Sequence, residues 1–306
     1  MMYLDHFGLR EAPFSITPNT AFAFATRAHR EALNTLLLAL DGGEGFIKIT
    51  GEVGTGKTLA CRRLLALLAQ QDRYMTAYVP NPCLSPRTLL LSIAMELRLP
   101  IRADAAEHEL LSALNSGLMR FAAEGRRVVL CLDEAQAIPT GTLEALRLLS
   151  NLETETAKLL QVVLFGQPEL DRKLAGTDLR QLAQRIAFSY ELGALDAEET
   201  ERYVAHRLRV AGFNGHATGG ALFAPAVMKA LHQATGGVPR LINIVAHKAL
   251  LLAFGEGALR VEKLHVAAAR RDTPQAQRLS HLLAGLRLVW TRPAHWWRVR
   301  RLGASA

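Results

Sequence analysis

The chain has 306 residues, of which 50% are hydrophobic and 21% are charged, a composition typical of a globular protein with about two domains. It contains no apolar run of the roughly 18–20 residues that a membrane-spanning helix needs, and its first residues lack the apolar core of a signal peptide. The cysteines and histidines follow no metal-ligand spacing, which argues against a metal centre held by those residue types and favours a reducing, cytoplasmic compartment.

The first 45 residues are predicted to form a linker and one helix. Aromatic residues and prolines are interspersed over residues 1–26, which favours extended structure and not helix. Residues 31–40 then show helical spacing and end at Gly42, where glycine suits a helix C-terminus. The aromatic side chains either line a ligand pocket or cover the edge of a sheet.

A glycine-rich loop between a strand and a helix is the strongest signal in the chain. Residues 46–50 predict a buried strand, and residues 59–70 have helical spacing. The stretch GEVGTGKT at 51–58 fits G-x-x-x-x-G-K-[ST] at every fixed position. Backbone N–H groups of such a loop and the helix N-terminus surround phosphate, so the loop is predicted to bind a nucleotide. The aromatic residues ahead of the loop would then line an adenine pocket, unless they only cover a sheet edge. The predicted nucleotide-binding residues are Gly51, Glu52, Val53, Gly54, Thr55, Gly56, Lys57, Thr58 and Leu59.

Two acids after another strand add a metal site and a catalytic base. Lys57 is expected to reach the β- and γ-phosphates of ATP, and the Thr58 hydroxyl to coordinate Mg²⁺. Residues 127–132 predict a strand covered on both faces, and Asp133 and Glu134 follow it directly. Asp133 would hold Mg²⁺ through its carboxylate, whereas Glu134 would orient or deprotonate the attacking water. Taken alone, the two acids are also consistent with solvated loop charges.

Polar residues near the last two predicted strands are candidates for contact with the γ-phosphate. Gln167 follows a strand predicted at 159–165 and would position the attacking water, unless it only caps the following turn. Arg185 ends a helix before a strand predicted at 187–192. It would reach the γ-phosphate of a neighbouring subunit as an arginine finger, with Arg180 as the reserve. The alternative is a surface arginine favoured by the dipole of its helix.

The order of the predicted elements gives the fold class. Strands alternate with helices over residues 46–194, with a further strand at 74–79, and this alternation predicts an α/β fold with a parallel five-stranded sheet flanked by helices. Only helices are predicted over residues 195–270. We therefore predict an α/β core followed by a small all-helical lid domain.

Arg240 is the candidate site residue of the helical part. It lies in the first turn of a helix predicted to begin at Pro239, directly after a Gly-Gly turn. A cation is unfavourable at the N-terminus of a helix, so an anion is expected beside it. The γ-phosphate would serve as that anion, and a nearby carboxylate is the alternative.

The tail at residues 271–306 is rich in Arg and holds all three tryptophans. Residues 270–306 contain eight Arg and one Asp, so this stretch carries +7 of the formal net charge of +8. Leucines at helical spacing among these arginines favour contact with an anionic membrane surface. Docking on a partner protein, an unfolded tail and contact with nucleic acid remain alternatives, the last being the weakest.

Together these residues resemble the AAA+ ATPases, and more narrowly the secretion ATPases of the general secretion pathway A (ExeA) group, above all those of MSHA pilus biogenesis. The resemblance covers roughly residues 2–270. It rests on YLDHFGLREAPFSITPNTAFAF, LCLDEAQAIP, LFGQPELD and GGVPRLINIVAHKALLLA. It assigns Walker A to 51–58, Walker B to 129–134, sensor 1 to Gln167, the arginine finger to Arg185 and sensor 2 to Arg240.

The resemblance implies a P-loop NTPase that hydrolyses ATP with Mg²⁺ in the cytoplasm, at times on the inner face of the inner membrane, and that forms homo-oligomers. It also implies a role with inner-membrane proteins in assembling a type IV pilus or type II secretion machine. Longer members of the group continue into a transmembrane helix and a peptidoglycan-binding region, and this sequence predicts neither. Two alternatives are a DNA-handling AAA+ ATPase and a nucleotide-switched scaffold with slow turnover.

Overall fold

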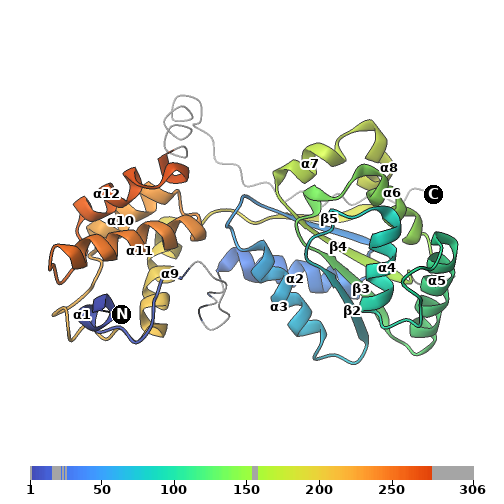
Figure 1. The fold of residues 1–306 in the computed structure, drawn as a ribbon, viewed down its shortest axis with the longest axis horizontal. Helices are drawn as coiled ribbons and strands as arrows, with labels where there is room; N and C mark the ends of the chain where they lie inside the picture. Colours follow the sequence, from blue (N-terminus) through green and yellow to red (C-terminus); the bar gives the residue numbers. More distant parts are fainter. Residues whose placement is uncertain (1, 16–21, 23, 25, 154–157, 278–306) are drawn as a thin grey trace, which may run out of the picture.

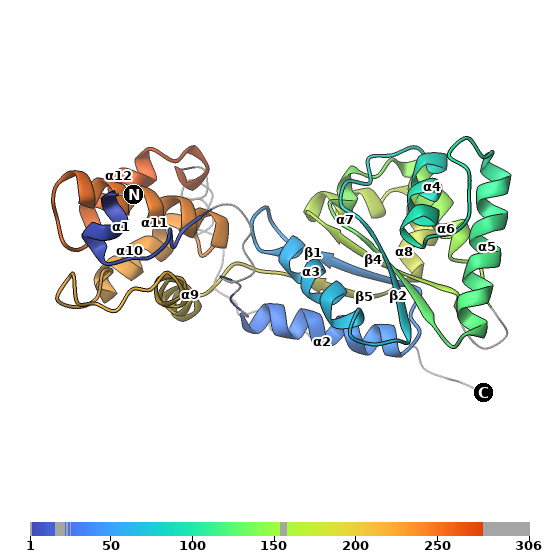
Figure 2. The same ribbon diagram turned by 60° about the horizontal axis from the view of Figure 1, so that its bottom comes forward.

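The computed structural model describes residues 2–15, 22, 24, 26–153 and 158–277. An α/β module with a sheet at its centre, here called the sheet module, lies beside a smaller all-helical module, the lid (Figures 1 and 2). No helix within the described ranges has both the length and the apolar character needed to cross a membrane.

The sheet module is built on five parallel strands in the order β2-β3-β4-β1-β5. The strands are rich in apolar and β-branched residues, and β4 is buried at every position, as expected for a sheet covered on both faces. The predicted α/β fold is therefore confirmed, and the predicted strand bounds agree to within one residue. The strands are β1 (Phe46–Thr50), β2 (Tyr74–Val79), β3 (Arg127–Leu132), β4 (Leu160–Gly166) and β5 (Ile186–Glu191).

Helices cover both faces of this sheet. Alternate strand residues point to opposite faces, so Ile47 and Ile49 pack with one set of helices and Phe46 and Val162 with the other. The first set is α2 (Arg27–Asp41) and α3 (Lys57–Leu68). The second set is α4 (Pro86–Glu96), α5 (Glu107–Ala123), α6 (Thr140–Leu149), α7 (Pro168–Leu174) and α8 (Arg180–Arg185).

The lid has a hydrophobic core of its own. Leu231, Ile242 and Leu250 are fully buried there, on helices whose apolar residues recur at helical spacing. After β5 ends at Glu191, the described residues form helices and no further strand. The lid helices are α9 (Ala197–Val210), α10 (Pro225–Thr235), α11 (Pro239–Gly255) and α12 (Lys263–Arg271), to which α1 (Met2–Phe7) is added.

The N-terminal segment differs from the sequence-based expectation. Extended structure over residues 1–26 is wrong for its beginning, because Met2–Phe7 form α1 ahead of the prolines. Tyr3, Phe7 and Phe14 are buried in the lid core, so these aromatic residues cover lid helices and not a sheet edge. The predicted first segment, 1–45, therefore divides between the two cores, with α1 in the lid and α2 on the sheet.

The end of the lid also lies beyond the predicted residue 270. Thr273 and Ala276 are buried, and Ala276 belongs to the lid core. The tail predicted at 271–306 thus contributes its first residues to the lid. Residues 278–306, which carry the tryptophans and most of the tail arginines, lie outside the described residues.

Candidate functional site

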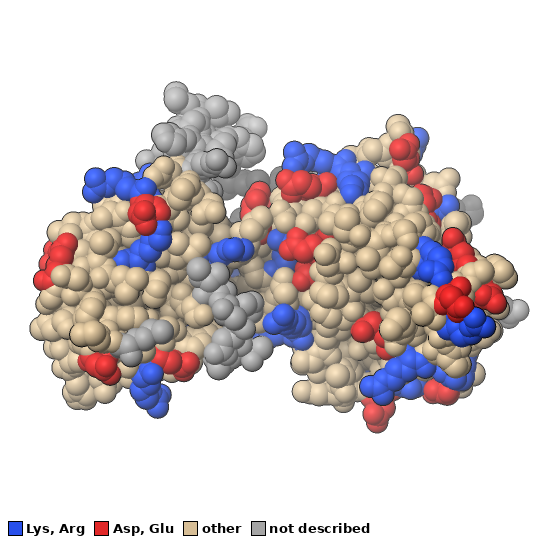
Figure 3. Space-filling view, in the orientation of Figure 1, with Lys and Arg blue, Asp and Glu red and all other residues tan. Residues whose placement is uncertain are grey.

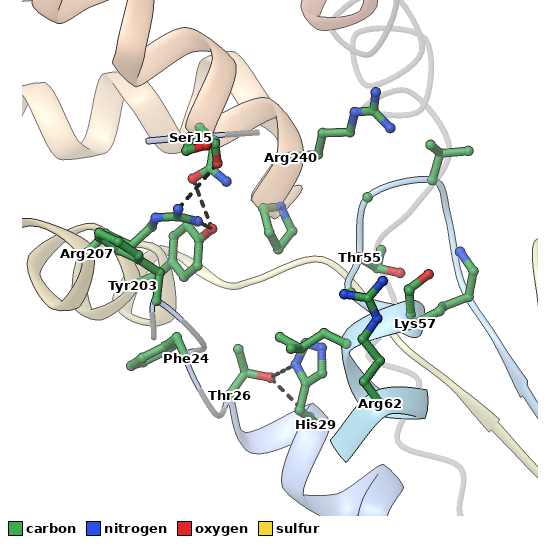
Figure 4. A pocket seen from close by; sticks show the side chains of 18 of the residues that line it. Ser15, Phe24, Thr26, His29, Thr55, Lys57, Arg62, Tyr203, Arg207 and Arg240 are labelled. Atoms are coloured by element: carbon green, nitrogen blue, oxygen red, sulfur yellow. Dashed lines mark hydrogen bonds between the residues drawn. The ribbon is translucent and has the colours of Figure 1, made fainter. Parts of the chain in front are cut away.

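A cavity of about 410 Å³ lies between the sheet module and the lid. The sheet module contributes the loop after β1 and the residues that follow β3 and β4, all at the carboxyl ends of parallel strands. The lid contributes residues of α9 and α11 (Figure 4). The crevice outside the carboxyl ends of the strands is where parallel sheets bind ligands, so this cavity is the candidate site.

The glycine-rich loop forms the floor of the cavity. Gly54 and Gly56 adopt positive φ angles of 87° and 99°, a conformation that side chains disfavour. A Cβ on Gly56 would lie 2.4 Å from Nε2 of His29, so this position accepts only glycine. Gly56 also precedes α3 without a side-chain cap, which leaves the first N–H groups of the helix available to an anion.

Lys57 is held at the centre of this loop. Its Nζ donates to the carbonyl oxygens of Gly51 at 2.7 Å and Glu52 at 2.9 Å. Burial lowers the pKa of the Lys57 ammonium, and the nearby carboxylates of Glu134 and Asp133 oppose that shift. Of the predicted nucleotide contacts, residues 53–59 line the cavity, whereas Gly51 and Glu52 do not.

Asp133 is a buried carboxylate at the end of β3. Only 3% of the residue is exposed, and its side chain lies beside Thr58 and accepts the backbone N–H of Glu134 at 3.0 Å. Burial raises the pKa of the Asp133 carboxyl, although the neighbouring Thr58 hydroxyl and the backbone N–H of Glu134 favour the ionised form. The structure thus brings together the two predicted metal-binding residues, whose oxygen atoms are the donors that Mg²⁺ prefers.

Glu134 follows with a left-handed backbone (φ 53°), an uncommon conformation for a residue with a side chain. Its Oε2 accepts a hydrogen bond from Nε2 of Gln167 at 3.0 Å and another from Nε2 of Gln136. Oε1 of Gln136 in turn accepts the backbone N–H of Gln167 at 3.0 Å. The two residues predicted to handle the attacking water, Glu134 and Gln167, therefore lie in direct contact.

Gln136 is a site residue that the sequence reasoning missed. It lies in a one-turn 3₁₀ helix, Ala135–Ala137, three residues after Asp133. Its side chain bridges the ends of β3 and β4, which are adjacent only in the folded sheet. A polar residue so soon after the two acids was the available signal, but its partner could not be known without the strand order.

Arg240 reaches the cavity from the lid. It lies in the first turn of α11, and its backbone N–H donates to the carbonyl oxygen of Gly54 at 3.3 Å. A Cβ on Gly54 would lie 2.5 Å from the Cβ of Arg240, so the loop and the lid touch directly. The Arg240 side chain is exposed, and no carboxylate of the described residues pairs with it.

The two candidate finger residues lie outside the cavity. Nη1 of Arg185 donates to Oγ of Ser150 at 3.3 Å and to the carbonyl oxygen of Arg147 at 3.5 Å, both at the C-terminal end of α6. Arg180, at the start of α8, is exposed. Neither contacts the cavity of its own chain, which is compatible with the predicted action on a neighbouring subunit.

The opposite end of the cavity is aromatic. Phe22 and Phe24 line it together with Tyr203 of α9, so the predicted aromatic pocket is found for these two N-terminal residues (Figure 4). His29, which is 5% exposed, also lines the cavity, and its Nδ1 lies 2.6 Å from Oγ1 of Thr26. Burial lowers the pKa of the His29 imidazole.

Residues 40–174 match the family described as AAA domain. General secretion pathway protein A of Aeromonas hydrophila is 42% identical over 303 residues, which is 97% of this chain and 54% of that protein. The chain thus spans about half the length of this relative.

Solved structures with a similar fold come from proteins of the ORC type. Aeropyrum pernix ORC2 in its ADP form has a TM-score of 0.61 and 18% identity, covering 92% of this chain and 79% of that one. Aeropyrum pernix ORC1 in complex with DNA has a TM-score of 0.61 and 19% identity, covering 90% and 72%. At such identities the likeness shows the fold alone. With its AAA domain, its P-loop fold and its 42% identity to that relative, the chain is an AAA+ protein of the general secretion pathway A (ExeA) type.

Proposed function

We propose that the protein is a Mg²⁺-dependent ATPase that works as an oligomer in a secretion or pilus assembly machine. The observation that carries the ATPase part is the contact between Gln167 and Glu134. These residues hold an amide and a carboxylate 3.0 Å apart in the cavity that Lys57 also lines. A binding site for nucleotide needs the loop and Lys57, but a hydrolase also needs this group to handle water.

Thr58 and Asp133 would hold the magnesium ion. They fit it, because the buried Asp133 carboxylate forms no salt bridge with the described residues and lies next to the Thr58 hydroxyl, a second oxygen donor. Magnesium, when bound, neutralises charge on the β- and γ-phosphates. Lys57 would bind those phosphates from the other side, exchanging its present bonds to loop carbonyls for phosphate oxygens.

Glu134 would take the proton of the attacking water. Both of its hydrogen-bond donors, Gln136 and Gln167, are neutral amides, which orient a carboxylate without neutralising its charge. The two amides therefore fix the position of the carboxylate without forming an ion pair with it. Gln167, at the tip of β4, would also donate to the γ-phosphate or the water once that contact forms.

Arg240 would bind the γ-phosphate from the lid, which would draw α11 and the glycine-rich loop together. Arg185 of a neighbouring subunit would complete the site, so hydrolysis would depend on assembly. For this role Arg185 must exchange its present bonds to Ser150 and Arg147 for the neighbour's phosphate. Arg180 needs no such exchange with the described residues and stays the reserve candidate.

The cellular role rests on the similarity to the secretion-pathway relative, which extends over 97% of this chain. We extend that likeness to the building of a type II secretion or type IV pilus machine, including pili of the MSHA kind, with inner-membrane proteins as partners. Replacing the gene by one encoding Glu134→Gln should reduce both secreted protein and surface pilin, if both machines use it. Unchanged levels of both products would contradict the assembly role.

The tail would tether this cytoplasmic protein to the inner face of the membrane. Residues 271–306 contain seven Arg and three Trp, a composition that suits anionic lipid headgroups. On the described surface in Figure 3, by contrast, Lys and Arg are interspersed with Asp and Glu. Flotation of the Glu134→Gln protein with ATP on anionic liposomes, in the presence of competitor duplex DNA, distinguishes binding to lipid from binding to DNA. Loss of flotation at modest DNA concentration would favour a DNA-handling role.

The ATPase proposal is tested by phosphate release in Mg²⁺ and in excess chelator. Wild-type protein should release phosphate only with Mg²⁺, and Glu134→Gln should bind ATP with unchanged affinity while turnover falls by about 10²–10⁴. Glu201→Gln is the matched control, since Glu201 is exposed on the lid. Equal turnover by wild-type and Glu134→Gln protein would exclude the proposed base, and background turnover by the assembled wild type would favour a nucleotide-switched scaffold.

A further inference from the structure

Three buried side chains form a hydrogen-bonded chain at the aromatic end of the cavity. Nη1 of Arg207 donates to the hydroxyl oxygen of Tyr203 at 2.8 Å, and that hydroxyl donates to Oδ1 of Asn243 at 2.9 Å. The three residues are 6–7% exposed and all line the cavity. Figure 4 shows Arg207 and Tyr203 on the lid, facing the N-terminal segment at Ser15.

Arg207 is fixed in place by the N-terminal segment. Its Nε donates to the carbonyl oxygen of Pro13 and its Nη2 to that of Ser15 at 3.3 Å. Its guanidinium carbon also lies 5.0 Å from the ring centre of Phe22. These contacts leave the guanidinium little freedom, so Nη1 is a stationary donor to Tyr203.

The hydrogen bonds from Arg207 to Tyr203 and from Tyr203 to Asn243 determine which way the amide of Asn243 faces. A guanidinium can only donate, so the Tyr203 oxygen accepts from Arg207 and its hydrogen must go to Asn243. The atom of Asn243 that receives it must be the carbonyl oxygen Oδ1. The amide nitrogen Nδ2 therefore points away from Tyr203 and finds no hydrogen-bond partner within the described part of the chain.

The surroundings of this amide are poor in strong acceptors. Glu134 is the one carboxylate among the described lining residues, and it lies at the phosphate end. The sequence places no Asp or Glu between Glu11 and Glu31, the stretch that includes Phe24 and Thr26. This end of the cavity thus offers aromatic faces and an oriented N–H donor, but no carboxylate.

We propose that Asn243 selects adenine by donating its amide N–H to N1 of the base, with Tyr203 and Arg207 as positioning residues. N1 of adenine carries no hydrogen and accepts such a bond. Guanine carries N–H groups at N1 and N2, which would meet this donor and no carboxylate acceptor. The inference rests on the proposed function, because it names the nucleotide that the same cavity takes.

Equilibrium dialysis of the full chain with radiolabelled ATP and GTP, each with Mg²⁺, tests the assignment. Wild-type protein should bind ATP at least about tenfold more tightly than GTP. Asn243→Asp replaces the donor by an acceptor of the same size, so the ratio of the two Kd values should fall about tenfold or more. Tyr203→Phe keeps the ring but frees the amide to rotate, so the ratio should fall less. Asn115→Asp, on the exposed surface of α5, is the control.

The outcomes separate this inference from the proposed function. Equal wild-type affinity for ATP and GTP, or an unchanged ratio in folded Asn243→Asp protein, would overturn the selection by Asn243 while leaving ATP binding intact. Failure of the wild-type protein to bind either nucleotide would overturn both. If Asn243→Asp does not fold, as judged by its thermal transition, an unchanged ratio in Tyr203→Phe overturns the inference instead, because the amide orientation depends on that hydroxyl.

Discussion

The two ends of the cavity are built in different ways. At the phosphate end, Lys57 and Thr58 are neighbours in sequence, and Asp133 and Glu134 follow one strand directly. At the base end, Phe24, Tyr203 and Asn243 come from three segments that are far apart in the chain. The residues of the phosphate end named here therefore all lie in the sheet module, whereas the base end exists only when the lid and the N-terminal segment are packed together.

The difference has a physical origin. Phosphate is bound by backbone N–H groups and a helix N-terminus, which a short glycine-rich sequence can arrange without help from the rest of the fold. A planar base is held by side-chain surfaces and a few oriented polar groups, which have no fixed spacing in sequence. The two ends should therefore respond differently to mutation, the first through turnover and the second through stability and selectivity.

The largest effect is expected for Arg185, and it tests whether the phosphate end is complete within one subunit. Arg185→Ala should lower the turnover of the assembled protein by about 10³–10⁵ without changing ATP affinity, because the finger acts only on the transition state. Arg180→Ala tests the reserve candidate, and Arg172→Ala is an exposed control. The measurement is ATP turnover over a range of protein concentrations. Unchanged rates for Arg185→Ala and Arg180→Ala at every concentration would mean that neither residue acts on a neighbouring subunit.

A smaller effect is expected at Gln136, which supports the phosphate end from outside the recognised motifs. Gln136→Ala removes one of the two amides that orient Glu134, so kcat should fall about tenfold at constant ATP affinity. Gln70→Ala, at an exposed position in the turn after α3, is the control. A change in ATP affinity with constant kcat would show that Gln136 acts in binding and not through Glu134.

The base end is expected to lose stability when Arg207 is shortened. Arg207→Ala leaves the carbonyl oxygens of Pro13 and Ser15 without their donor and should lower the free energy of unfolding by about 2–4 kcal/mol. Arg209→Ala, at an exposed position two residues farther along α9, should change the free energy of unfolding by less than about 0.5 kcal/mol. Chemical denaturation measures both free energies of unfolding. Equal values for the two variants would contradict a stabilising role of the Arg207 hydrogen bonds.

Acid should lower the free energy of unfolding, in part through His29 at the base end. Burial lowers the pKa of His29, His206 and His247 below the usual 6.5, so these groups bind protons less readily in the folded protein than in the unfolded chain. The free energy of unfolding should therefore be highest above pH 6.5 and fall as the pH drops from there through the lowered pKa values. Denaturation at about pH 7.5 and 5.5 shows the effect, which His29→Gln should reduce and the exposed His108→Gln should not. Stability that rises in acid would contradict this linkage.

The same contrast explains what the sequence could and could not predict. The five strands and the positions of Lys57, Asp133 and Gln167 follow from contiguous apolar runs and the residues that end them. Gln136 and Arg207 escaped notice because their partners lie on elements whose adjacency only the tertiary structure defines. The sequence does not predict the helix at Met2–Phe7, because Pro13 and Pro18 disfavour helix over the rest of the segment but not over its first residues.

The packing of the N-terminal segment on the lid means that the chain passes between the two modules twice. It leaves the lid core after Phe24 and enters α2 at Arg27, then returns between Glu191 and Ala197. A rigid body attached at one point can swivel in any direction, but one attached at two points keeps a single axis of rotation. Two connections therefore restrict any rotation of the lid relative to the sheet module to the line that joins them.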